Sequence, residues 1–240
     1  MNIDRMKFVD GTQIRDGILV HMPQLNKFVF HITTEIRKEY IGHQLSNDDI
    51  QKTFTKIGYE QVGCIVKNLR RSGSCQVFSL PFIGDFLTSV GNIFPSTVFC
   101  HVKKLGLFDI VPFEHEFFLR IARFFPSLTK LDVSNLTPQL HSSNVFDSNG
   151  NQLYPIVEYP HLTSLGLLSC HTDYIEQFLN NTKTHLSRLT HLKINYDQLR
   201  FVTQDFTRDA TRFHCAQVKE LIIYRTLVPS KDFCTYFPLL

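Results

Sequence analysis

The clearest indication of the fold is the stretch Phe125–Val133, with the sequence FPSLTKLDV. Its apolar residues Leu128, Leu131 and Val133 form a Leu-x-x-Leu-x-Val pattern after a proline. Leu131 and Val133 are two positions apart, and side chains with that spacing lie on the same face of a β-strand. Leu128 enters the same core from the preceding turn. The stretch therefore predicts a short strand with one buried face.

More divergent copies of this pattern recur along the chain. The first apolar residues of the copies are Leu25, Val77, Val102, Leu128, Leu162, Leu189 and Val218. Most steps between successive copies lie near the roughly 20–29 residues of a leucine-rich repeat. One further copy is expected to have decayed between Phe30 and Val77. A single unit of this kind cannot bury its apolar face alone, so we expect neighbouring units to stack.

The intervals between the copies carry helix signals. Ser46 and Asp49 form an S-x-x-D capping box, and Phe113–Phe125 has apolar residues at helical spacing. Shorter helices are expected at Tyr174–Leu179 and Lys231–Phe237. Strands and helices in alternation predict an α/β fold, a leucine-rich-repeat solenoid with a curved parallel sheet on the concave side and helices on the convex side.

The predicted solenoid is one domain over residues 1–240, with about 7–8 degenerate repeats of about 25–34 residues. The spacing lapses after Leu136, where a polar segment with an Asn149-Gly150 turn signal predicts an inserted loop at about 138–154. A solenoid needs polar caps, and Leu240 belongs to none, so we expect truncation at one or both ends. The alternative is an unrelated α/β domain whose parallel strands share a Leu-rich pattern.

Composition and charge exclude several classes of function. The net charge is +3, and the nearest approach to a basic cluster is Lys67, Arg70 and Arg71. Nucleic-acid binding needs a concentrated basic face, so no nucleic-acid partner is expected. No apolar run approaches the roughly 20 residues that span a bilayer, and the charged N-terminus is unlike a signal peptide. With six scattered cysteines read as reduced thiols, we expect a cytoplasmic or nuclear protein without a membrane partner.

Catalytic and metal-binding motifs are not recognisable. His115-Glu116 begins like the HExxH zinc motif, but Leu119 stands where the second histidine is needed. The sequence has no Gly-rich phosphate loop and no G-x-S-x-G elbow. We therefore expect no enzymatic activity, no cofactor and no metal. The alternative left open is an enzyme on an α/β fold, which requires a cleft with converging titratable groups.

The segments Phe125–Val133, Tyr159–Leu167 and Phe237–Leu240 resemble the divergent leucine-rich repeats of F-box proteins. The resemblance extends from about Met22 to the end of the chain. It implies a repeat region that captures a protein substrate, while a separate F-box joins a cullin-RING ubiquitin ligase through a Skp-type adaptor. The residues before Leu25 are too few for an F-box, so the adaptor and cullin are expected partners only if an F-box lies outside this chain.

These observations predict a non-enzymatic protein–protein interaction module, either the substrate-recognition region of an F-box-like receptor or a scaffolding protein unrelated to ubiquitin. The variable positions of the strands are expected to project from the concave face and bind the partner. They are Val29, His31, Phe108, Asp132, Ser134, Leu168, Lys193, Asn195, Ile222 and Tyr224. Their mixture of apolar, aromatic and polar groups favours a protein partner, with Phe108 and Tyr224 as the leading anchors.

Overall fold

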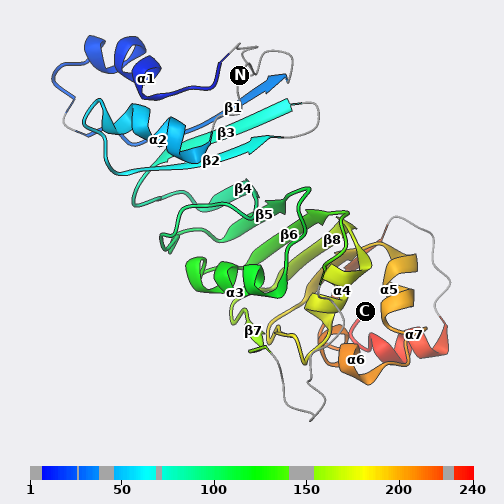
Figure 1. Cartoon of the computed structure of the whole chain (residues 1–240). Coiled ribbons are helices and arrows are strands. Elements are labelled where there is room, and N and C mark those ends of the chain that lie inside the picture. The colour runs from blue at the N-terminus through cyan, green and yellow to red at the C-terminus, as the bar shows by residue number, and fades with distance from the viewer. Residues whose placement is uncertain (1–6, 26, 38–45, 69–71, 141–153, 224–229) are drawn as a thin grey trace. The chain divides into compact units, whose positions relative to one another are not determined.

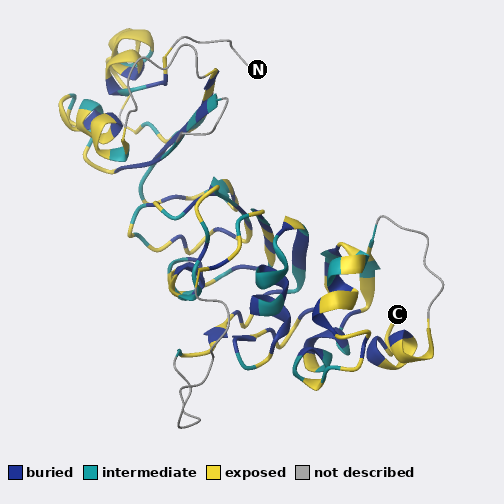
Figure 2. Ribbon diagram, turned by 45° about the vertical axis from the view of Figure 1, so that its right-hand side comes forward, coloured by how far each residue is buried: buried dark blue, intermediate teal, exposed yellow. Residues whose placement is uncertain are grey.

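A computed structural model describes residues 7–25, 27–37, 46–68, 72–140, 154–223 and 230–240 (Figure 1). The chain divides into two compact units. The first comprises Met1–Ile83 and Ile93–Ser96, and the second comprises Gly84–Asn92 and Thr97–Leu240. Within the units, exposed residues concentrate on loops and on the outer turns of helices (Figure 2).

The first unit contains a three-stranded antiparallel sheet. Its central strand β3 (Ser72–Ser79) pairs with β1 (His31–Arg37) on one side and β2 (Val62–Asn68) on the other. The unit also contains α1 (Gly11–Gly17), a short 3-10 helix η1 (Leu19–His21) and α2 (Asn47–Thr55).

Side-chain caps begin both α-helices of the first unit. Asp10 caps α1 by accepting from the Gln13 amide. The capping box predicted at Ser46 is confirmed, because the Ser46 hydroxyl accepts from the Asp49 amide and the Asp49 carboxylate accepts from the Ser46 amide. The apolar sides of the helices and the sheet form one buried cluster. It comprises Phe8, Val9, Ile14, Ile36, Ile50, Phe54, Val62, Cys64, Cys75 and Val77.

The second unit contains a six-stranded parallel sheet whose neighbours follow the order of the chain. Its strands are β4 (Phe86–Val90), β5 (Lys104–Phe108), β6 (Lys130–Asn135), β8 (Ser164–Cys170), β10 (His191–Ile194) and β11 (Glu220–Ile222). A separate parallel pair joins β7 (Val157–Glu158) and β9 (Thr184–His185). The helices are α3 (His115–Phe124), α4 (Thr172–Leu179), α5 (Tyr196–Val202), α6 (Asp209–Cys215) and α7 (Lys231–Tyr236).

One recurring interaction aligns the starts of the parallel strands. The carbonyl oxygen of Thr129, just before β6, accepts from the amides of Thr163 at 2.9 Å and Ser164 at 3.0 Å. The carbonyls before β4, β5, β8 and β10 each accept two consecutive amides in the same way. We call this series the carbonyl ladder, and its acceptors are Asp85, Lys103, Thr129, Thr163 and Thr190.

Threonine hydroxyls strengthen the carbonyl ladder. Thr129 donates to the Lys103 carbonyl at 3.1 Å, Thr163 to the Thr129 carbonyl at 3.1 Å, and Thr190 to the Thr163 carbonyl at 3.2 Å. The register that follows aligns buried side chains across the sheet. They are Leu105 and Leu107, Leu131 and Val133, Leu165 and Leu167, and Leu192 and Ile194. Phe118 of α3 and Phe178 of α4 are also buried, with ring centroids 5.0 Å apart.

The prediction of one leucine-rich-repeat solenoid is wrong, although an α/β fold is consistent with the structure. The sheet of the first unit is antiparallel: Val77 lies in β3 between two antiparallel neighbours, and Leu25 lies in no strand. The copies beginning at Val102, Leu128, Leu162, Leu189 and Val218 do lead into strands. Apolar residues two apart predict a strand with one buried face but do not determine the direction of its neighbours. The spacing alone therefore led us to extend the predicted repeat into the first unit, where the strands are antiparallel.

Other sequence expectations have mixed outcomes. The expected helices at 113–125, 174–179 and 231–237 correspond to α3, α4 and α7. Most of the polar insertion expected at 138–154 lies outside the described residues. None of the helices in the described ranges has the length and apolar character needed to cross a membrane.

Gly11 allows α1 to approach α2 closely. A Cβ atom at this position would lie 2.4 Å from the Thr53 carbonyl oxygen and 2.7 Å from the Phe54 amide nitrogen, both backbone atoms. At Gly17, the other end of α1, a Cβ atom would meet nothing within 4 Å.

We expect Gly11→Ala to destabilise the first unit by about 1–3 kcal/mol, because the methyl group forces the two helices apart. Gly17→Ala is the matched control and should cause no loss. Amide hydrogen exchange of Ile50 and Phe54 in the full chain, followed by mass spectrometry, would measure the local opening energy. Equal exchange rates in the two variants would contradict this account of α1 packing.

Candidate functional site

The parallel sheet of the second unit has one face that no described helix covers. Alternate strand residues stand on it in rows across the sheet, and we call it the open face. The first row is Phe86, Lys104, Lys130, Ser164, His191 and Glu220. The middle row is Thr88, Gly106, Asp132, Gly166, Lys193 and Ile222, and the third is Phe108, Ser134 and Ser169. Except for Gly166, these residues are exposed or half-buried.

Positive charge collects where β5 meets β6. Lys104 lies directly opposite Lys130 in the sheet register, and both residues are exposed. Like charges directly opposite one another destabilise a sheet. Lys130 is partly balanced by Asp132, with Nζ 3.8 Å from Oδ2, whereas Lys104 forms no ion pair with any described residue. This part of the open face therefore favours a negatively charged ligand.

Asp132 is packed against the sheet by a glycine on the neighbouring strand. A Cβ atom on Gly166 would lie 2.1 Å from the Asp132 Oδ1 atom, so this carboxylate occupies the space that any other residue's side chain would fill. Gly106, on the other side of Asp132, also lacks a side chain. Gly166 is buried beneath the Asp132 carboxylate, whereas Gly106 is half-buried.

Apolar side chains flank the charged centre of the open face. Phe86 of β4 is 52% exposed, and Ile222 of β11 is 38% exposed. Phe108, at the end of β5, is half-buried. At the far end of the first row, His191 Nε2 lies 3.4 Å from the Glu220 carboxylate. Aromatic and aliphatic groups around polar centres are typical of protein interfaces.

The structure places the predicted binding residues in two different units. Val29 precedes β1 and His31 begins it, so both belong to the antiparallel sheet of the first unit. Tyr224 lies outside the described residues. The second unit contains the others, on or beside its parallel sheet. They are Phe108, Asp132, Ser134, Leu168, Lys193, Asn195 and Ile222.

The repeated pattern did not predict the local role of Asn195 or the neighbour of Ser134. The Asn195 side chain caps α5, its Oδ1 accepting from the amides of Asp197 at 2.9 Å and Gln198 at 3.2 Å. The β6–β8 register shifts after Asp132, so that Ser134 lies opposite Ser169 and not opposite Leu168. A shift of this kind adds a residue to one strand and re-aims the side chains that follow.

Sequence reasoning missed the first row of the open face. Lys104 and Lys130 precede Gly106 and Asp132 by two positions, and the same period of two places His191 before Lys193. Extending the strands backwards would have found these residues. Phe86 was harder to find, because β4 carries no copy of the repeated phrase.

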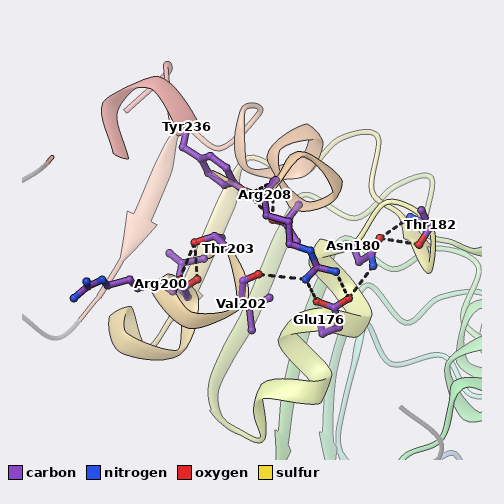
Figure 3. A network of polar contacts seen from close by, with 10 residues as sticks. Glu176, Asn180, Thr182, Arg200, Val202, Thr203, Arg208 and Tyr236 are labelled. Carbon is purple, nitrogen blue, oxygen red and sulfur yellow. Dashed lines mark hydrogen bonds and ion pairs between the residues drawn. The ribbon is translucent and has the colours of Figure 1, made fainter. Parts of the chain in front are cut away.

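A half-buried polar network in the second unit is a competing candidate (Figure 3). Arg208 binds the Glu176 carboxylate with both terminal nitrogens, Nη2 lying 2.8 Å from Oε1. Nη1 also donates to the Val202 carbonyl at 3.3 Å. The Asn180 amide donates to Glu176 at 2.8 Å. The network joins α4 to the segment before α6.

The charges of this network are satisfied within it. Burial opposes ionisation of Glu176, but the bonds from Arg208 and Asn180 outweigh it and hold the pKa of Glu176 below its ordinary value. Lys183 nearby is 8% exposed, and burial lowers its pKa. Because each member of the Glu176–Arg208 pair is held by several partners, we interpret the network as a structural connection between helices.

A hollow of about 560 Å³ beside α6 offers no evident catalytic arrangement. It is lined by Ser187, Asp209, Arg212, Phe213, Ala216 and Gln217. The Asp209 carboxylate lies 3.8 Å from Arg212 Nε, so its main charged groups already face each other. Within the described ranges, no three His, Cys, Asp or Glu residues are grouped to hold a metal ion.

Comparison with known proteins gives no further guide: no family model, no curated protein and no solved structure matches this chain. We therefore take the open face as the candidate site because of its exposed charged and apolar side chains.

Replacing Arg208 with methionine should lower the free energy of unfolding by about 1–3 kcal/mol, because the largely buried Glu176 carboxylate would lose its cationic partner. Arg200→Met is the matched control, since the Arg200–Asp205 pair is exposed and its loss should not be measurable. Urea unfolding of both variants at neutral pH makes the comparison. Equal destabilisation would show that burial does not distinguish the two pairs.

The Glu176 pair should also make stability depend on pH. The folded-state pKa of Glu176 is depressed below the ordinary value of 4.5. The ionised carboxylate therefore contributes fully to stability above pH 4.5, and this contribution is lost as the pH falls through the folded-state pKa. The stability advantage of the parent chain over Glu176→Gln should therefore shrink on acidification below pH 4.5. Thermal unfolding of the two proteins across this range tests the sign, and an advantage that grows in acid would refute it.

Proposed function

We propose that this chain is a protein-interaction module that binds a segment of a partner protein on the open face of its second unit. The observation that carries the proposal is a six-stranded parallel sheet with one face uncovered by any described helix. Parallel sheets occur almost only where both faces are covered. A bound partner would supply the second layer.

The residues of the open face indicate the chemistry of the partner segment. Lys104 and Lys130 favour acidic side chains, which would relieve the repulsion between these two opposed cations. Phe86 lies beside Lys104 on β4, and Phe108 lies further along β5, so both offer apolar contact near the lysines. Aromatic side chains often carry much of the energy of an interface. The expected ligand is an acidic protein segment with an apolar anchor.

The biological role of this binding depends on whether the full-length product also contains an F-box. A role in substrate capture for a ubiquitin ligase requires an F-box outside this chain, and a Skp-type adaptor and a cullin would then accompany the partner. A scaffolding role requires neither. Both settings use the same open face, so the composition of the native complex separates them.

The test is affinity purification of the native full-length product from its own cells, with cross-linking mass spectrometry of the bound proteins. We expect cross-links from an acidic partner segment to Lys104 or Lys130. The double variant Lys104→Glu/Lys130→Glu should reduce recovery of that partner by about tenfold or more, through loss of charge complementarity. Thermal unfolding of this variant should match that of the parent.

The matched control is Lys56→Glu/Lys231→Glu, which changes the net charge equally. Both of its lysines are exposed and belong to none of the rows of the open face: Lys56 ends α2 as its C-cap, and Lys231 begins α7. The control should retain the partner. Equal loss in both double variants would attribute binding to net charge, and full retention by the Lys104→Glu/Lys130→Glu variant would exclude the open face as the binding site.

A further inference from the structure

Two cysteines of the first unit face each other across neighbouring strands. Cys64 lies in β2 and Cys75 in β3, and their sulfur atoms are 3.8 Å apart. Cys64 is paired with Val77 in the sheet register, and Cys75 with Val66. The two cysteines are therefore diagonal neighbours on the same face of an antiparallel pair, close enough for their side chains to interact.

The pairing is specific within this chain. All six cysteines lie in described residues, and Cys64 and Cys75 are the two in sulfur contact. Cys170 and Cys215 are buried in the second unit, whereas Cys100 and Cys234 are exposed. A disulfide requires its sulfur atoms to be about 2.05 Å apart and its Cβ atoms to face each other. The Cys64 and Cys75 sulfur atoms, 3.8 Å apart, must therefore move about 1.8 Å closer. Diagonal neighbours have Cα atoms roughly 7–8 Å apart, which exceeds the usual span of a disulfide, so β2 and β3 must also shift.

We propose that Cys64 and Cys75 are an oxidisable dithiol, which a peroxide converts to a disulfide that ties β2 to β3. One sulfur attacks a peroxide oxygen, the O–O bond breaks, and a sulfenic acid and water form. The second sulfur then displaces the sulfenic oxygen as water and forms the S–S bond. The thiols lose two electrons and two protons, and hydrogen peroxide is reduced to two molecules of water.

Burial controls when this oxidation occurs. Cys64 is 2% exposed and Cys75 is 1% exposed, and both belong to the same buried cluster as Ile50 and Phe54 of α2. The contact with Cys75, together with burial, raises the pKa of Cys64 far above its ordinary value. Because the thiolate is the reactive form, the closed unit reacts slowly. The reaction should therefore proceed when the helices and the sheet open locally.

The test uses the full chain carrying Cys100→Ser/Cys234→Ser, which removes the exposed thiols. The protein is treated with hydrogen peroxide, alkylated in urea and digested with trypsin. Lys67, Arg70 and Arg71 lie between the two cysteines, so trypsin separates their peptides unless a disulfide joins them. We expect joined peptides containing Cys64 and Cys75, which dithiothreitol separates, while Cys170 and Cys215 remain open to alkylation.

Variants at Gly11 and Gly17 test the dependence on opening. Gly11→Ala should accelerate formation of the joined peptides by about tenfold, because it loosens the packing of α1 on α2. Gly17→Ala should leave the rate unchanged. The proposal is overturned if the Gly11→Ala protein yields separate Cys64 and Cys75 peptides after prolonged oxidation. It is also overturned if Cys64 joins Cys170 or Cys215 as readily as it joins Cys75.

Discussion

The carbonyl ladder at the starts of the parallel strands is the interaction on which the second unit depends. Each of its five acceptors receives two consecutive amides at the start of the next strand, which aligns the starts of the strands from β4 to β11. A slip of one residue would carry Leu131 and Val133 from the buried side to the open face, since side chains alternate along a strand. The hydroxyls of Thr129, Thr163 and Thr190 oppose such a slip by binding the same carbonyls.

The open face is a consequence of that register. Once Leu105 and Leu107 are buried, Lys104, Gly106 and Phe108 must point the other way. The buried positions of the strands must therefore be apolar, whereas the alternate positions on the open face can differ in charge and size. The two opposed lysines at β5 and β6 lower the stability of the sheet itself. An acidic partner would relieve their repulsion, and that relief would strengthen its binding.

The two units differ in the interactions that hold their helices in place. In the first, the sheet and its helices share one apolar cluster, and the Cys64–Cys75 contact lies within it. In the second, helices are joined by polar groups as well, and the Glu176–Arg208 pair connects α4 with the segment before α6. A paired and hydrogen-bonded charge can be retained in such a half-buried site, whereas an isolated charge is costly there.

Local patterns in the sequence are enough to place many of the strands and helices and to predict which strand side chains are buried. Spacings of two and of three to four residues are local, and they located β5, β6, β8, β10 and α3. The position of β3 between two antiparallel strands, and the pairing of Ser134 with Ser169 in place of Leu168, were not predictable from those patterns. A strand's apolar pattern states which face is buried, but its neighbours, their direction and a one-residue shift depend on hydrogen bonds between segments distant in the chain.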